Sequence, residues 1–65
     1  MAACSESIGE FEKIVASDAA TGNLNKSVYR KIVAEMGSAK TSCAAGRDAE
    51  ALRELAAVKS RHGYR

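Results

Sequence analysis

Apolar residues recur at intervals of three and four along the first part of the chain, which is the spacing of one face of an α-helix. This pattern predicts a helix over about 5–20. Ser7 and Glu10 form an S-x-x-E capping box, which is typical of a helix start. The apolar stripe of this helix consists of Cys4, Ile8, Phe11 and Val15, with Ile14 beside it.

The same spacing predicts a second helix over about 26–45. Its stripe consists of Tyr29, Ile32, Met36, Ala39 and Cys43, widened by Val28 and Val33. Lys31 and Glu35 are four residues apart on the outer face, so we expect them to form a modest ion pair. Gly37 costs about 1 kcal/mol relative to alanine inside a helix, so the helix can kink or fray there.

A third helix is predicted over about 48–61, with Asp48 as its cap and Gly63 as its stop. Its stripe consists of Ala51, Leu52, Leu55 and Val58. The residues expected on its solvent side are Arg47, Glu50, Arg53, Glu54 and Arg61. Tyr64 and Arg65 would then form a short tail.

Two glycine-containing segments separate the predicted helices. In the first, Gly22 ends one helix, Asn23 or Asn25 caps the next, and Leu24 packs beneath the turn. In the second, Gly46 ends the second helix. The pattern therefore predicts an all-α, three-helix domain. The helices of about 5–20 and 26–45 form an antiparallel hairpin, and the helix of about 48–61 packs across it.

The composition agrees with this fold and limits its size. The 65 residues make a single domain, 1–65, and a core this small needs a covalent staple or a partner chain. Apolar residues make up 46% of the chain, which argues against disorder. The net charge of +2 is too small to indicate a nucleic-acid partner. No apolar run reaches the roughly 20 residues that a membrane span needs.

The two cysteines, Cys4 and Cys43, are expected to form a disulfide. They lie at equal distances on either side of the turn near Gly22, so an antiparallel hairpin brings them to the same height. Both also belong to the apolar stripes that face each other. Gly9 and Gly37 lie at one height just inside this bridge, where they would let the helices approach or leave room for the third helix. Two separate buried thiols in a reduced protein are the alternative.

The first residues bear on the compartment. Met1, Ala2 and Ala3 look like a start methionine placed on the remnant of a signal-peptide cleavage site, where small residues precede the cut. A native cytosolic N-terminus is an alternative. Ala2-Ala3-Cys4 also resembles the end of a bacterial lipobox, in which Cys4 would carry a lipid anchor. A disulfide favours an oxidising compartment, so we expect a periplasmic or secreted protein.

Residues 17–28 resemble an EF-hand calcium loop. Placing Gly22 at the sharp turn of such a loop puts Leu24 at its usual aliphatic position. The first, third and last coordinating positions would then be Ser17, Ala19 and Val28, so the bidentate glutamate is missing. We therefore predict a plain turn between two helices and no metal site.

The basic end of the chain offers candidate interaction residues, which are Arg53, Lys59, Arg61, His62 and Tyr64. With Arg65 added, the cations can form a patch for nucleic acid or anionic lipid, although such a set is more often a solvated face. His62 is the only histidine and is expected on the surface. No catalytic, phosphate-binding or dinucleotide motif is present, so we predict no enzyme activity and no cofactor.

The chain is similar to a loose group of small exported bacterial proteins of unknown function. In these proteins a cysteine opens the mature part, a second cysteine precedes an Ala-Gly-x-x-x-x-Ala turn, and a Leu-x-x-x-Lys helix leads to a terminal glycine. The matching residues are Cys4, Cys43, Ala45, Gly46, Ala51, Leu55, Lys59 and Gly63. The resemblance implies a periplasmic helical domain and no particular activity.

Together these observations favour a non-enzymatic, disulfide-stabilised module that binds another protein or a second copy of itself. A carrier of a small ligand or metal ion, using the groove between helices or the loop 17–28, is the alternative from a different class.

Overall fold

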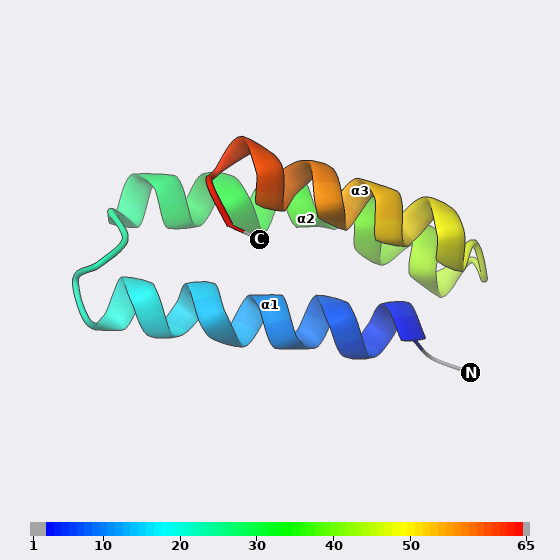
Figure 1. The fold of residues 1–65 in the computed structure, drawn as a ribbon, viewed down its shortest axis with the longest axis horizontal. Coiled ribbons are helices and arrows are strands. Elements are labelled where there is room, and N and C mark those ends of the chain that lie inside the picture. The colour runs from blue at the N-terminus through cyan, green and yellow to red at the C-terminus, as the bar shows by residue number, and fades with distance from the viewer. Residues whose placement is uncertain (1–2, 65) are drawn as a thin grey trace.

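The computed structural model describes residues 3–64, which form three α-helices and no strand. These are α1 (Ala3–Ala20), α2 (Lys26–Ala44) and α3 (Asp48–Arg61). Helices α1 and α2 run antiparallel, and α3 folds back along α2 (Figure 1). The predicted all-α, three-helix domain is therefore confirmed. Met1 and Ala2, predicted as a cleavage remnant, and Arg65 in the tail lie outside the described residues.

The two helices of the hairpin begin in different ways. Asn25, one of the two predicted candidates with Asn23, caps α2, because its side-chain oxygen accepts a hydrogen bond of 2.7 Å from the backbone N–H of Ser27. The capping box at Ser7 and Glu10 is wrong, since α1 already includes Ala3. The helix has to extend that far because Cys4 belongs to its buried face.

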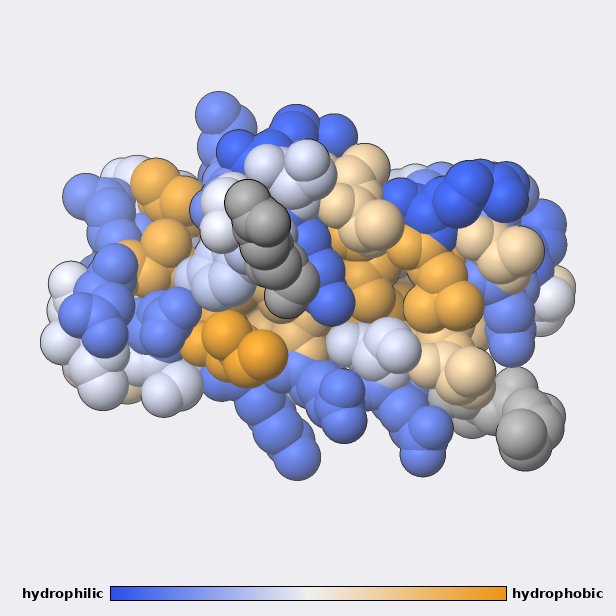
Figure 2. All heavy atoms as spheres, viewed as in Figure 1, coloured by the Kyte–Doolittle hydropathy of each residue, from blue (hydrophilic) through white to orange (hydrophobic). Residues whose placement is uncertain are grey.

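The core is built from the predicted apolar stripes. Its buried residues come from all three helices and are Ile8, Phe11, Val15, Ile32, Met36, Ala39, Leu55 and Val58. Leu24 packs against this core from the turn, as expected. Ile14 and Val33, which were expected beside the stripes, remain exposed at 50% and 44%. Leu52 was predicted within the stripe of the third helix, and that prediction is wrong, because Leu52 is 37% exposed. Figure 2 shows hydrophobic residues along the middle of one face, between α1 and α3, with hydrophilic residues along its edges.

Both ends of α3 are set by glycines with positive φ, Gly46 at 80° and Gly63 at 76°. After Gly46, the N–H of Arg47 donates to the carbonyl of Ser42. After Gly63, the N–H of Tyr64 donates to the carbonyl of Lys59. This is the Schellman pattern, which reverses the chain at a helix end. The first glycine turns α3 back along α2, and the second turns Tyr64 back toward α1.

The C-terminal tail is therefore part of the packed structure. The Tyr64 ring meets the Phe11 ring edge to face, with 5.1 Å between the centroids. Its hydroxyl donates a 2.8 Å hydrogen bond to Asp18 Oδ2 near the end of α1. Burial raises the pKa of Tyr64, and the hydrogen bond and negative charge of Asp18 raise it further.

Polar side chains join α2 to α3. Glu54 accepts hydrogen bonds from Ser42, at 2.8 Å, and from Ser38, at 3.0 Å. Ser42 is itself only 3% exposed, so this contact satisfies a buried hydroxyl. The prediction that Glu54 faces solvent is wrong, because the pattern of apolar residues does not reveal a polar partner on another helix.

Helix α2 continues without a break through Gly37, between the buried residues Met36 and Ala39. A Cβ atom added at Gly37 would meet nothing within 4 Å. We expect Gly37→Ala to stabilise the protein by about 0.5–1 kcal/mol, because alanine favours a helix interior. Thermal unfolding followed by circular dichroism should show a melting temperature a few degrees higher.

Gly46→Ala is the matched control, since a Cβ there also meets nothing within 4 Å but the backbone is left-handed. We expect it to destabilise by about 1–2 kcal/mol. Equal effects of the two substitutions would contradict this account of the two glycines.

Candidate functional site

The most distinctive chemistry lies at the open end of the hairpin, where a disulfide joins Cys4 to Cys43. The two Cα atoms are 5.9 Å apart, within the range that a disulfide spans. The bridge predicted from the register of the hairpin is therefore confirmed. Neither cysteine is a free thiol, and the bond occupies the sulfur to which a lipid anchor at Cys4 would be attached.

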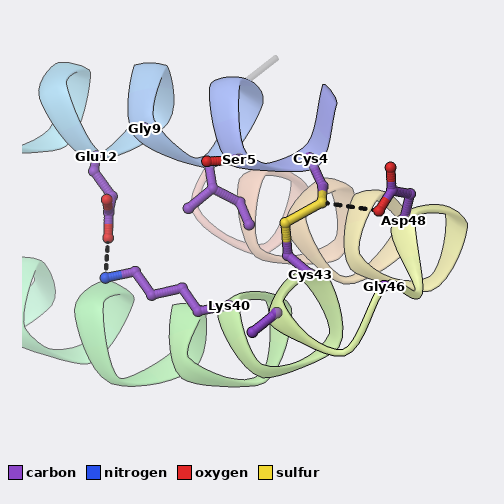
Figure 3. A pocket seen from close by; sticks show the side chains of 10 residues that line it. Cys4, Ser5, Gly9, Glu12, Lys40, Cys43, Gly46 and Asp48 are labelled. Atoms are coloured by element: carbon purple, nitrogen blue, oxygen red, sulfur yellow. Dashed lines mark hydrogen bonds and ion pairs between the residues drawn. A yellow bond between two sulfur atoms is a disulfide. The ribbon is translucent and has the colours of Figure 1, made fainter. Parts of the chain in front are cut away.

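The carboxylate of Asp48 lies against this bridge. Its Oδ1 atom is 3.3 Å from Cys4 Sγ (Figure 3). A sulfur in a disulfide carries no hydrogen, so this is a close contact between oxygen and sulfur rather than a hydrogen bond. The predicted role of Asp48 as the cap of α3 is wrong, because Arg47 holds that position and makes no capping hydrogen bond with its side chain. The tight turn at Gly46 places Asp48 inside the helix and beside Cys4 instead.

A groove opens beside the disulfide, between α1 and α2. It has a volume of about 660 Å³ and is lined by Cys4, Ser5, Ile8, Gly9, Glu12, Lys40, Cys43, Ala44, Gly46 and Asp48. Asp48 is its only lining residue from α3, so the groove lies on the side of the hairpin that α3 leaves open. An ion pair between Glu12 and Lys40 crosses from α1 to α2 at the end of the groove away from the bridge (Figure 3).

A second hollow of about 430 Å³ follows the same two helices and also involves Gly9 and Glu12. Its walls include the exposed side chain of Val33 and the half-buried ring of Tyr29. Gly9 and Gly37 were expected to allow close packing of the helices or to make room for the third. No atom of a neighbouring helix lies within 4 Å of a Cβ added at either position, so that expectation is wrong. Their lack of side chains leaves space open to solvent.

The candidate interaction residues near the C-terminus do not form one free cationic surface. Lys59 Nζ lies 5.6 Å from the centroid of the Phe11 ring, which Tyr64 also contacts. Arg61 and His62 lie against a carboxylate of α2. Arg53 is exposed. The apolar pattern could not show these separate contacts, since each depends on which side chain another helix presents.

The carboxylate of α2 that contacts both Arg61 and His62 is that of Glu35. Its Oε1 atom is 3.0 Å from His62 Nε2 and 3.4 Å from Arg61 Nε. The hydrogen bond with His62 lowers the pKa of Glu35 most, and the positive charge of Arg61 lowers it further, against the opposing effect of burial. The His62 side chain is only 14% exposed, so the surface position expected for it is wrong. The predicted pair of Lys31 with Glu35 is also wrong, because Glu35 points to α3.

The loop resembling an EF-hand is closed by its own hydrogen bonds. The N–H of Leu24 and the hydroxyl of Thr21 both donate to the carbonyl of Asp18, and the Asp18 carboxylate accepts from Tyr64. Among residues 3–64, no three acidic, cysteine or histidine side chains come together as a metal site would require.

No protein-family model, no curated protein and no solved structure matches this chain. The fold and the bridge define its class, which is a small all-α protein of three helices held by a disulfide. Within the described residues, none of the three helices combines the length and the apolar character needed to cross a membrane.

The disulfide should supply a large part of the stability. It joins residues 39 apart, and in the chain-entropy model a loop of that size is worth about 4 kcal/mol. We expect the double variant Cys4→Ala, Cys43→Ala to melt more than about 15 °C below the wild type. Wild-type protein in excess reductant is the matched control and should lose a similar amount. A loss below about 1 kcal/mol in both samples would contradict this role of the bridge.

The contacts of Glu35 predict an acid-dependent loss of stability. Its pKa is lower in the folded chain than the ordinary value of 4.5, so the contribution of the ionised carboxylate is present above about pH 4.5. The contribution is lost as the pH falls below 4.5 through the lowered pKa. Glu35→Gln should therefore be less stable than the wild type at neutral pH, and the difference should shrink in acid. Denaturant titrations from pH 2 to pH 7 measure this difference.

Glu10→Gln is a matched control, because Glu10 is exposed and makes no ion pair among the described residues. A gap between wild type and Glu35→Gln that stays constant across the titration would contradict the linkage.

Proposed function

We propose that this protein is a non-enzymatic, exported helical module that binds a helical segment of another protein, or of a second copy of itself, along the open side of its α1–α2 hairpin. The observation that carries the proposal is the pair of hollows between α1 and α2, which α3 leaves uncovered. An amphipathic helix that lays its apolar face into such a groove is a common mode of protein recognition.

The chemistry of the groove supports a protein partner. Val33 is 44% exposed at the wall of the second hollow, and Gly9 and Ala16 contribute no bulk to fill that hollow. The charged pair of Glu12 and Lys40 crosses the groove and offers both signs of charge to a partner. An apolar centre with charged groups at its rim is the usual anatomy of a protein interface.

Export is part of the same proposal. Disulfides persist in oxidising compartments and are rare in the cytosol. The bridge between Cys4 and Cys43 therefore favours a periplasmic or extracellular site of action.

A single substitution at the wall of the second hollow tests the proposal. We expect Val33→Glu to place a charge in the binding surface without disturbing the core, since Val33 is largely exposed. It should weaken the affinity for a captured partner, or for a second copy of the chain, by at least tenfold. Capture by the immobilised protein measures the first, and sedimentation measures the second.

Ile14→Glu is the matched control, because Ile14 is also half-exposed, on α1, and lines neither hollow. It should bind like the wild type. If Val33→Glu and Ile14→Glu behaved alike, the groove would not be the binding surface. A monomer that retained no partner, but whose melting temperature rose with a metabolite, would favour the alternative of a small-ligand carrier. The volume of about 660 Å³ beside the bridge favours that second candidate.

A further inference from the structure

The two sulfurs of the disulfide lie in different surroundings. Cys4 is 1% exposed, and its Sγ atom has the Asp48 carboxylate 3.3 Å away. Cys43 is half-buried and lines the groove beside Ala44 and Gly46, at the end of α2. A molecule approaching from the groove therefore has easier access to Cys43 than to Cys4.

These surroundings matter because thiol–disulfide exchange is a reaction of anions. A thiolate attacks one sulfur, and the other sulfur leaves as a thiolate. Attack on Cys4 would bring a negative charge toward Asp48. Attack on Cys43 would develop negative charge on Cys4, again beside Asp48. Like charges at this distance repel strongly where water is partly excluded, so the carboxylate opposes both routes. Burial blocks the first route as well.

The other charges near the disulfide do not cancel the repulsion that Asp48 exerts on a thiolate. The N-terminus of α3 would favour a thiolate at Cys4 through its dipole, but Asp48 is the first residue of that helix and offsets it. Lys40 lines the groove and is paired with Glu12, and Arg47 is paired with Glu50. Asp48 is therefore the charge that acts most directly on the bridge.

We propose that the burial of Cys4 directs thiol exchange at this disulfide to Cys43 and that Asp48 slows the exchange, so that Cys43 is the site at which a small thiol such as glutathione forms a mixed disulfide. In that step the thiolate sulfur bonds to Cys43 Sγ, the bond between Cys43 and Cys4 breaks, and its electron pair leaves on Cys4 Sγ. Solvent then protonates Cys4. With a dithiol, a second exchange yields two protein thiols and the oxidised cyclic reductant.

The first experiment identifies which of the two cysteines the small thiol attacks. Folded, oxidised wild-type protein is treated briefly with reduced glutathione, quenched in acid, alkylated with N-ethylmaleimide and mapped by tandem mass spectrometry. The expected product carries glutathione on Cys43 and the alkyl group on Cys4. Glutathione found mainly on Cys4, or equally on both cysteines, would overturn the proposal.

The second experiment measures the rate. Asp48→Asn keeps the size of the side chain and removes its charge. Reduction of the bridge by dithiothreitol should be about tenfold faster in this variant, as expected from losing one repulsive charge at contact distance. Added salt should speed reduction of the wild type and have a smaller effect on the variant, because ions screen the repulsion.

Glu50→Gln is the control, since Glu50 lies in the same turn of α3 and pairs with Arg47 rather than the bridge. It should be reduced at the wild-type rate. Thermal melts of the oxidised variants show whether Asp48→Asn loosens the fold. A loosened fold would speed reduction at every salt concentration equally, and that result would overturn the electrostatic role. An unchanged rate in Asp48→Asn would also overturn it.

Discussion

The covalent bond between Cys4 and Cys43 is the constraint on which the rest of the structure depends. The hairpin of α1 and α2 is closed at one end by the turn after Ala20 and at the other by this bond. A chain of this length buries little apolar surface, so restricting the unfolded chain contributes a large share of its stability. With both ends fixed, the two apolar stripes are held face to face.

Helix α3 packs against one side of the α1–α2 hairpin. Glycines at both of its ends reverse the chain, and polar contacts along its length fix its rotation against α2. Glu54 satisfies two serines of α2, and Glu35 of α2 holds Arg61 and His62. Tyr64 then ties the C-terminus to α1. The other side of the hairpin is left open, and this asymmetry is what makes it a candidate binding surface.

The bridge also illustrates how a local charge can change the chemistry of a structural bond. The turn at Gly46 brings the start of α3 to Cys4, which places a carboxylate beside the buried cysteine. Both cysteines line the groove, and the half-buried Cys43 is the more accessible of the two. A disulfide that stabilises the fold and lies beside an open groove is exposed to small thiols. A negative charge at the buried sulfur is one physical means of protecting it.

The sequence alone determined the three helices, most of the stripes that form the core and the pairing of the cysteines, and it narrowed the cap of α2 to Asn23 or Asn25. These features depend on periodicity, turn chemistry and register, which are properties of short segments and of a hairpin geometry. Only the tertiary structure decided the partners of Asp48, Glu54, Glu35, His62 and Tyr64. Their contacts depend on how each helix is rotated about its axis and on which polar group the neighbouring helix presents, and the spacing of apolar residues carries no information about either.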